Sequence, residues 1–240
     1  MEGLYNGFVR PWMGVGQSGR QMRPLRDRGE AGQRLAEQLA AYTGRQDLIV
    51  LGLPRGGVPV AYEIAQALHA PLDVCVVRKL GVPGQPELAM GAIALGGVRV
   101  LNEEVVASLA IPESLIATVV AKEMQEAERR ERLYRSDRPP LDLAGKTVIL
   151  VDDGVVTGAT MRAAIVALRT QKPAKVIVAV GVAPPETCAT LAQEADEVVC
   201  LLQPEGFWSV GLWFADFAPT SDEEVRILLA HADAAAQFVQ

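Results

Sequence analysis

Short apolar runs alternate along most of the chain with longer segments in which apolar residues recur every three or four positions. A continuous apolar run bounded by turn residues is typical of a strand that is buried on both faces. Apolar residues at helical spacing are typical of an amphipathic helix packed against such a strand. The alternation therefore predicts an α/β fold with a mostly parallel sheet. We expect buried strands at residues 48–53, 72–77, 146–151, 175–180 and 196–201.

The segments between the apolar runs carry the expected helices. In residues 27–42, Ala31, Leu35 and Leu39 recur at the spacing that places them on one face of a helix. In residues 58–68, the proline falls in the first turn, where a helix tolerates it. We expect further helices at residues 103–135, divided near Pro112, at 161–169, at 185–192 and from about 221 onward.

Three regions interrupt the alternation. Residues 1–26 contain prolines and glycines without a periodic pattern, which predicts an irregular N-terminal arm. Residues 81–86 are rich in glycine and proline, and strands expected at 90–95 and 98–101 meet at Gly96-Gly97, a hairpin signal. We therefore expect one domain over residues 27–240, with an insertion at about 81–145 and an aromatic segment at about 203–220.

Composition narrows the class of protein. The chain has 240 residues, 50% apolar and 22% charged, which is typical of a globular protein with a substantial core. Its formal charge of −6 argues against a dedicated nucleic-acid-binding protein, whose footprint would be basic. Cys75, Cys188 and Cys200 stand apart within apolar runs, so we expect reduced core residues rather than metal ligands. The sequence shows neither a secretory signal pattern nor a run long enough to span a bilayer, which predicts a cytoplasmic protein.

The most informative stretch joins an acidic pair to the start of a helix. Asp152 and Asp153 follow the apolar run 148–151, and a turn of glycine and threonine leads to the helix expected at 161–169. The start of a helix presents unpaired backbone N–H groups and the positive end of the helix dipole, which suit a phosphate. Two carboxylates would repel that phosphate, so they must face hydroxyl groups or a cation. A ribose with a 5′-phosphate, with Mg²⁺ nearby, satisfies both halves of the stretch.

Polar segments also follow two other expected strands. Residues 55–57 come after strand 48–53, and their two glycines permit a tight turn whose N–H groups point at an anion. Arg78 and Lys79 end the strand expected at 72–77, where two cations suit a diphosphate better than a core. Because ligands bind beyond the carboxyl ends of parallel strands, we expect these segments and the acidic pair to line one crevice. The alternative for the first segment is an ordinary βα turn.

Residues 150–160 resemble the ribose-phosphate motif of type I phosphoribosyltransferases, which has an apolar strand, two acids and, after a short gap, Thr-Gly-x-Thr. Segments 51–61 and 76–94 and the aromatic tail extend the likeness to a group of bacterial phosphoribosyltransferases whose acceptor is unassigned. The resemblance implies a mostly parallel sheet flanked by helices, a hairpin and helical insertion, and residues 203–220 as a C-terminal hood.

The resemblance also implies a role for each site residue. Asp152 and Asp153 would bind the ribose hydroxyls of phosphoribosyl pyrophosphate, with Mg²⁺ reached mainly through the substrate and water rather than by direct protein ligands. In this family the pyrophosphate loop often contains a non-proline cis peptide, for which the candidate is Arg55–Gly56 or its neighbour. The 5′-phosphate would lie on Val156, Thr157, Gly158, Ala159 and Thr160, and the pyrophosphate on Arg55, Gly56, Gly57, Arg78 and Lys79. The residues expected to act in catalysis are Arg55, Lys79, Asp152 and Asp153.

These roles imply transfer of the 5-phosphoribosyl group to a nitrogenous acceptor with release of pyrophosphate. Members of the family that use 6-oxopurines carry an aspartate at the position of Val156, which puts hypoxanthine or guanine salvage in doubt. We expect small-molecule substrates, a homodimer, and no nucleic-acid or membrane partner. The alternative is a non-catalytic regulator or sensor that binds phosphoribosyl pyrophosphate or a nucleotide on the same fold. The cations Arg55, Arg78 and Lys79 favour catalysis, because a sensor of the 5′-phosphate would not need them.

Other patterns have more than one interpretation. An acidic pair after an apolar strand also occurs in receiver domains, but there it lies near the start of the domain. A nucleotide-dependent hydrolase is disfavoured because the chain lacks the motif GxxxxGK[ST]. Residues 14–19 match the dinucleotide-binding fingerprint GxGxxG, but no strand precedes them, so we do not expect a dinucleotide site there. Loop 81–90 is either a mobile flap or a plain connection, and the aromatic residues at 207–217 either stack on a base or pack in the core. The arginines at 129–138 alternate with glutamates, which predicts a solvated, salt-bridged helix face.

Overall fold

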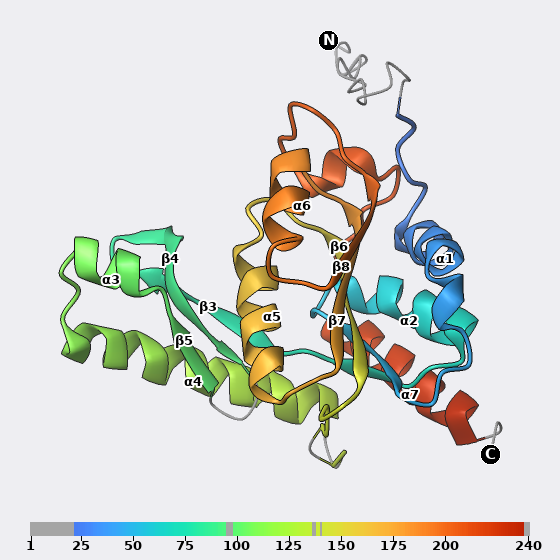
Figure 1. Ribbon diagram of the computed structural model, residues 1–240, viewed down its shortest axis with the longest axis horizontal. Coiled ribbons are helices and arrows are strands. Elements are labelled where there is room, and N and C mark those ends of the chain that lie inside the picture. Colours follow the sequence, from blue (N-terminus) through green and yellow to red (C-terminus); the bar gives the residue numbers. More distant parts are fainter. Residues whose placement is uncertain (1–21, 95–97, 136–137, 140, 238–240) are drawn as a thin grey trace, which may run out of the picture.

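The apolar runs form a parallel sheet at the centre of the protein (Figure 1). Figure 1 is a computed structural model, which describes residues 22–94, 98–135, 138–139 and 141–237. Within these residues, five parallel strands follow the order β2-β1-β6-β7-β8, and β1 is buried along its whole length. The strand bounds are Leu72–Val74 for β2, Leu48–Gly52 for β1, Thr147–Gly154 for β6, Lys175–Val182 for β7 and Glu197–Leu202 for β8.

Helices cover both faces of this sheet, because successive residues of each strand point to opposite sides. In β6, Ile149 and Val151 pack with α1, α2 and α7, whereas Val148 and Leu150 pack with α5 and α6 (Figure 1). This layering confirms the predicted α/β fold with a mostly parallel sheet. The helices are α1 (Arg28–Gln38), α2 (Gly57–Leu68), α5 (Ala159–Thr170), α6 (Pro185–Leu191) and α7 (Asp222–Gln237), with short 3-10 helices η1 (Ala40–Tyr42) and η3 (Val210–Trp213).

A second, antiparallel sheet forms a lobe beside α5 (Figure 1). It has a small core of its own around Leu80, Met90 and Ile116. The lobe consists of β3 (Val77–Val82), β4 (Gln85–Ala94), β5 (Val98–Leu101), α3 (Glu103–Ser108) and the long helix α4 (Glu113–Arg135).

The single strand predicted over residues 72–77 is wrong at its C-terminal end. In the part of the chain that the structure describes, β2 is an edge strand that pairs only with β1, and the paired residues end at Gly52 and Val74. The Cys75 N–H makes one more bond, to the Gly52 carbonyl at 3.0 Å, and after it no pairing with the central sheet follows in the described residues. The chain leaves that sheet and pairs with β4, so Arg78 and Lys79 lie within β3 rather than at the end of a core strand.

The glycine- and proline-rich loop predicted at residues 81–86 is also shorter than expected. The pairing of β3 with β4 continues to Val82 and Gln85, which leaves a tight turn at Pro83-Gly84. Gly84 has a φ of +83°, a conformation that glycine adopts without strain. The two strands predicted around Gly96-Gly97 pair antiparallel as β4 and β5, while that turn itself lies outside the described residues.

Strand β6 extends beyond its predicted end at residue 151, because β7 continues alongside it. Asp152 pairs with Val180, and Gly154 pairs with Val182. The acidic pair thus lies within the last part of β6, and its position is set by the sheet itself. Helix α5 begins at Ala159, slightly earlier than predicted.

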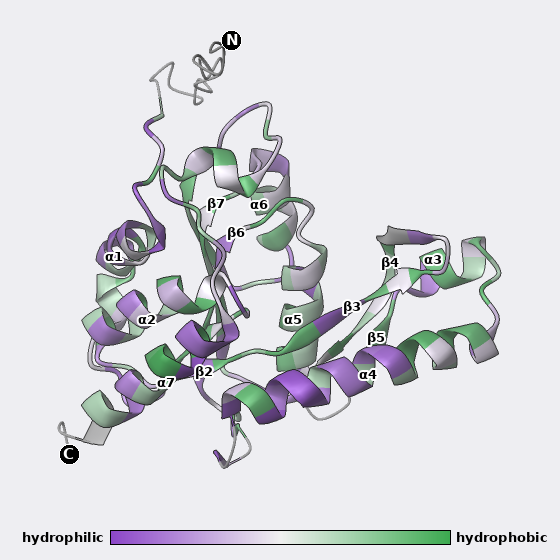
Figure 2. Ribbon diagram, turned by 180° about the vertical axis from the view of Figure 1, so that it is seen from behind, coloured by the Kyte–Doolittle hydropathy of each residue, from purple (hydrophilic) through white to green (hydrophobic). Residues whose placement is uncertain are grey.

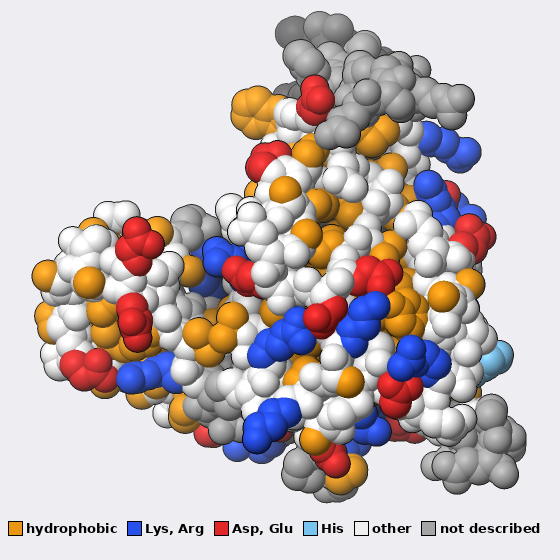
Figure 3. Space-filling model, in the orientation of Figure 1, with side chains coloured by type: hydrophobic (Ala, Val, Ile, Leu, Met, Phe, Trp, Pro, Cys, Tyr) orange, Lys and Arg blue, Asp and Glu red, His pale blue; other side chains and the backbone are white. Residues whose placement is uncertain are grey.

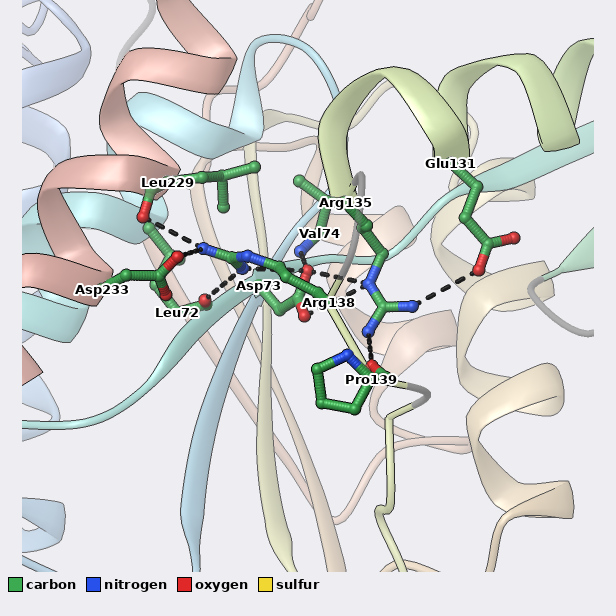
Figure 4. Close-up of polar contacts among 9 residues, drawn as sticks. All are labelled: Leu72, Asp73, Val74, Glu131, Arg135, Arg138, Pro139, Leu229 and Asp233. Atoms are coloured by element: carbon green, nitrogen blue, oxygen red, sulfur yellow. Dashed lines mark hydrogen bonds and ion pairs between the residues drawn. The ribbon is translucent and has the colours of Figure 1, made fainter.

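A network of ion pairs, buried at Arg135 and Asp73, joins the lobe to the main sheet (Figure 4). Arg135 of α4 donates from Nε to Asp73 Oδ1 of β2 at 3.2 Å, and Arg138 lies 3.3 Å from the same oxygen. Arg138 also donates to the Leu229 carbonyl at 3.0 Å and forms an ion pair with Asp233 of α7 at 2.5 Å. The network therefore links the long helix, the edge strand and the C-terminal helix.

The predicted solvated face of α4 is confirmed for part of the arginine cluster only. Arg129 and Arg132 are exposed, and they pair with Glu126 and Glu128 one turn earlier on the helix. For Arg135 and Arg138 the prediction is wrong, because their side chains are only 5% and 17% exposed.

Hydrophobic residues gather along the strands of the central sheet, whereas α4 carries many hydrophilic residues (Figure 2). No helix in the described ranges is both long enough and apolar enough to cross a membrane. Cys75 and Cys188 are buried, Cys200 is half-buried, and all are free cysteines. The predicted N-terminal arm is described only from residue 22 onward, and the GxGxxG match at residues 14–19 lies outside the described residues.

Candidate functional site

The glycine-rich turn after β1 packs directly against the acidic pair at the end of β6. A Cβ on Gly56 would lie 2.1 Å from Asp153 Oδ2, and a Cβ on Gly57 would lie 2.5 Å from the Val151 carbonyl oxygen. Real Cβ atoms do not approach other atoms so closely, so only glycine fits at either position without a shift. The Leu53 N–H donates to the same Val151 carbonyl at 2.9 Å. Two of the three predicted segments therefore meet at one edge of the sheet.

The same turn contains a cis peptide bond between Pro54 and Arg55. The prediction names Arg55–Gly56 or its neighbour, and the cis bond is at the neighbour, Pro54–Arg55. Arg55 is exposed, and its guanidinium lies 3.7 Å from Asp222 at the start of α7. Asp222 also accepts a hydrogen bond from the Tyr134 hydroxyl at 2.5 Å, and burial together with this bond raises the pKa of Tyr134 to about 12.

The two carboxylates of the acidic pair have different surroundings. Asp152 accepts a hydrogen bond from the Asp153 N–H at 2.9 Å, and burial and the neighbouring charge of Asp153 raise the pKa of Asp152 well above its usual range. Asp153 forms an ion pair with Arg28 of α1, whose Nε lies 2.8 Å from Asp153 Oδ2. No local pattern marks Arg28 in the sequence, because its partner lies on a strand more than half the chain away.

The turn between β6 and α5 has the geometry of an anion site. Gly158 has a φ of +76°, directly precedes the first residue of α5 and offers no side-chain cap, and the Ala159 N–H makes only a long bond of 3.5 Å to the Thr157 hydroxyl. The Thr187 hydroxyl of α6 donates to the Val156 carbonyl at 2.7 Å, and this bond ties the turn to α6. Thr157 and Thr160 are exposed, as is Val156.

Arg78 and Lys79 reach the site from the lobe rather than from a core strand. They line a cleft of about 680 Å³ that also includes Pro54 of the glycine-rich turn and Thr160 of α5. Arg78 forms an ion pair with Glu123 of α4 at 2.6 Å. Lys and Arg side chains gather where the lobe meets the main body, beside a hollow in the surface (Figure 3). The structure thus brings the third predicted segment next to the other two.

The segment at residues 81–90, expected as a flap or a plain connection, forms a β-hairpin whose tip lines this cleft. Its closure over a substrate stays a prediction. Of the two interpretations of the aromatic tail, packing in the core is confirmed for Trp213 and Phe214, and stacking on a base stays a prediction. Trp213 and Phe214 are buried in the core, Phe217 stacks on Phe214 with ring centroids 5.1 Å apart, and Trp208 is 82% exposed.

The protein side chains of the site do not form a metal cage. No group of three or more His, Cys, Asp or Glu side chains capable of holding a metal ion occurs in the described part of the chain. Asp152 and Asp153 lie together at the end of β6. They fit Mg²⁺ that keeps most of its ligands as water and substrate oxygens, which is its usual mode beside phosphates.

A parallel α/β sheet with an acidic pair, a glycine-rich turn and a helix start at one edge is typical of α/β proteins that bind phosphorylated ligands beyond the carboxyl ends of their strands. The family model of the phosphoribosyl transferase domain matches residues 25–214, so the chain belongs to that family.

One similar protein and one similar structure cover most of the chain. A Mycobacterium tuberculosis protein named "Putative phosphoribosyl transferase Rv0571c" is 48% identical over 214 residues, which cover 88% of this chain and 48% of that protein. The chain thus spans about half the length of the curated relatives it matches. The crystal structure of TT1426 from Thermus thermophilus matches with a TM-score of 0.79 and 43% identity, over 88% of this chain and 99% of that one.

Proposed function

We propose that the protein transfers the 5-phosphoribosyl group of phosphoribosyl pyrophosphate to a nitrogenous acceptor and releases pyrophosphate. The observation that carries the proposal is the packing of the glycine-rich turn against the acidic pair, with the start of α5 next along the chain. Phosphoribosyl pyrophosphate needs three neighbouring sites: one for the ribose hydroxyls, one for the phosphate at C5′ and one for the diphosphate at C1′. Membership of the phosphoribosyl transferase family supports the same activity.

The donor would bind along the end of β6. Asp152 and Asp153 would accept hydrogen bonds from the ribose 2′- and 3′-hydroxyls. Backbone N–H groups of residues 156–160 and the hydroxyls of Thr157 and Thr160 would bind the 5′-phosphate, because the start of α5 carries a partial positive charge.

The leaving diphosphate would lie between the glycine-rich turn and the lobe. As the acceptor nitrogen bonds to C1′, the bond from C1′ to the diphosphate oxygen breaks, and negative charge grows on the diphosphate. Arg55, the N–H groups of Gly56 and Gly57, and the cations Arg78 and Lys79 would stabilise that charge. Holding both reactants in line would supply much of the remaining acceleration.

Mg²⁺ would neutralise part of the charge of the diphosphate. It would bind mainly to substrate oxygens and water, with Asp152 and Asp153 reaching it through the ribose hydroxyls or through water. The acidic pair would in that way orient both the sugar and the ion.

The acceptor is constrained by two side chains. Val156 is 47% exposed at the turn, and its side chain cannot exchange a proton. It therefore cannot act as a general base toward a 6-oxopurine. Trp208 offers a broad, exposed aromatic face on the segment that includes Val210, whose methyl groups lie against Gly154. A planar nitrogenous base would stack on such a surface.

We also propose that the protein acts as a homodimer in the cytoplasm. Light scattering of the purified protein and fractionation of the source cells would test these two statements directly.

The decisive experiment combines the protein with labelled phosphoribosyl pyrophosphate, Mg²⁺ and a panel of bases, and follows pyrophosphate release. We expect binding of the donor and turnover with at least one base. Asp152→Asn/Asp153→Asn should abolish binding, whereas Asp142→Asn, at an exposed site away from the turn, should not change it. Absence of binding, or equal binding by the double variant, would overturn the site. Binding without turnover on any base would instead favour a non-catalytic regulator.

A further inference from the structure

Arg28 lies between the acidic pair and the aromatic tail, and it contacts both. Its Nε donates to Asp153 Oδ2 at 2.8 Å, and its Nη1 donates to the Ala218 carbonyl at 2.7 Å. Its guanidinium also lies 4.1 Å from the centroid of the Phe217 ring, within the range of a cation–π interaction. The side chain is only 13% exposed, so these contacts are largely shielded from water.

The position of Arg28 is not explained by the needs of its own helix. Arg28 is the first residue of α1, where the helix dipole disfavours a positive charge. The N-cap role is already filled by Asp27, whose carboxylate accepts a hydrogen bond from the Glu30 N–H at 2.8 Å. The contacts that stabilise the Arg28 side chain are therefore the distant ones, to Asp153 and to the tail.

The backbone around Arg28 holds the tail in the same place. The Leu25 N–H donates to the Trp213 carbonyl at 2.9 Å, and the Ala215 N–H returns a bond to the Leu25 carbonyl at 2.8 Å. The Asp216 N–H donates to the Arg26 carbonyl at 2.8 Å. The segment before α1 and the tail thus form one unit beside the end of β6, and Arg28 connects this unit to the acidic pair.

Asp153 is confined from two sides. Arg28 bonds to its Oδ2, and the backbone of Gly56 approaches the same oxygen so closely that a Cβ would lie 2.1 Å away. A carboxylate has only two oxygens, so the bond to Arg28 decides how the second oxygen is oriented. The positive charge of Arg28 also offsets the repulsion between two adjacent carboxylates and an anionic substrate.

We infer that Arg28 is a positioning residue, which orients Asp153 toward the ribose and joins the donor site to the tail at Phe217 and Ala218. The inference rests on the proposed function, since it assigns a role in binding phosphoribosyl pyrophosphate. Arg28 itself does not touch the reacting atoms; it acts through Asp153. The forked guanidinium is required because it donates in two directions while its face lies on an aromatic ring.

The test is calorimetric titration of phosphoribosyl pyrophosphate with Mg²⁺ into the wild-type protein, Arg28→Ala, Arg28→Lys and the control Arg34→Ala. Arg34 lies on the same helix with its side chain 42% exposed, and it has a weak pair to Glu30 at 3.8 Å. We expect Arg28→Ala to bind the donor at least about tenfold more weakly, and Arg28→Lys to recover only part of that loss. Arg34→Ala should bind as the wild type does.

Chemical rescue separates positioning from a merely structural role. Millimolar guanidinium should restore part of the affinity of Arg28→Ala, because the cavity left by the side chain accepts it, and should leave the wild-type protein and Arg34→Ala unchanged. If Arg28→Ala does not fold, weaker binding by Arg28→Lys at an unchanged melting temperature supports the inference. Wild-type affinity in a folded Arg28 variant, or a loss that guanidinium does not restore in folded Arg28→Ala, overturns it. Absence of binding by the wild-type protein overturns the proposed function itself.

Discussion

The carboxylate of Asp153 packs directly against Gly56. A Cβ on residue 56 would lie 2.1 Å from Asp153 Oδ2 and 2.8 Å from Asp153 Cγ, too close for any side chain. This relationship joins the turn proposed for the diphosphate to the strand end proposed for the ribose. It means that the two halves of the donor site are built on one another. A substitution of Gly56 or of Asp153 should therefore affect both the diphosphate site and the ribose site.

Gly56→Ala should lower both stability and donor binding. The added methyl group must displace the Asp153 carboxylate from Arg28 or move the turn, and we expect a loss of about 1–3 kcal/mol in the free energy of unfolding. Binding of phosphoribosyl pyrophosphate should weaken at least about tenfold. Urea denaturation and calorimetric titration would measure the two effects.

A double-variant cycle identifies the cause. In an Asp153→Ala background the clash is absent, so Gly56→Ala should cost clearly less stability than it does in the wild-type protein. Equal costs in both backgrounds would contradict direct contact as the cause.

Asp152→Asn should stabilise the protein at neutral pH while it weakens donor binding. The pKa of Asp152 is raised well above its ordinary 3.8 by burial and by the charge of Asp153. The folded state therefore binds a proton more tightly than the unfolded state, and this contribution to stability is lost as the pH rises through the raised pKa. An amide avoids the loss, and we expect a gain of about 1 kcal/mol at neutral pH.

The pH dependence is the sharper measurement for this variant. Stability curves of the wild-type protein and Asp152→Asn should lie close together below the ordinary pKa and separate as the pH rises above it. Curves that run parallel throughout would contradict the raised pKa. The control Asp142→Asn should follow the wild-type curve.

Glu123→Gln should tighten the binding of inorganic pyrophosphate. Arg78 is held by Glu123 at 2.6 Å, so a diphosphate in the cleft competes with this carboxylate for the guanidinium. Removing the competing charge should increase the affinity by about three- to tenfold. Glu128→Gln, at an exposed position of the same helix where the partner is Arg132, should have no effect. Weaker or unchanged binding by Glu123→Gln would show that Arg78 does not reach the diphosphate.

Arg135→Met should destabilise the protein strongly. The substitution leaves Asp73 buried beside one remaining cation, and removal of one partner from a buried ion pair costs about 3–5 kcal/mol. Arg129→Ala, which breaks an exposed pair on the same helix, should cost less than about 1 kcal/mol. Thermal or urea denaturation would compare them, and similar losses would contradict a structural role for the buried network in Figure 4.

Much of the fold follows from local patterns. The apolar runs that became β1, β6 and β7 are buried on both faces, and such burial is the condition that makes a strand continuously apolar. The segments at residues 55–57 and 152–160 also come together as expected, because the carboxyl ends of parallel strands share one edge.

The path after β2 could not be predicted in the same way. Residues 75–77 are apolar and suit a strand, but whether they continue β2 depends on a partner strand, and β1 has already ended there. Pairing with a partner is a property of the assembled sheet. For this reason the sequence placed Arg78 and Lys79 at the end of a core strand, whereas they approach the cleft from the lobe.

By itself the sequence determined the α/β class, the segments that surround the candidate site and the likeness to phosphoribosyltransferases, since each of these depends on residues that are close together in the chain. Only the tertiary structure decided that Arg28 pairs with Asp153, that Glu123 pairs with Arg78, and that Arg135 is buried on Asp73. The physical reason is the same in each case. An ion pair depends on distance in space, and a charged residue carries no local mark of the partner that folding brings beside it.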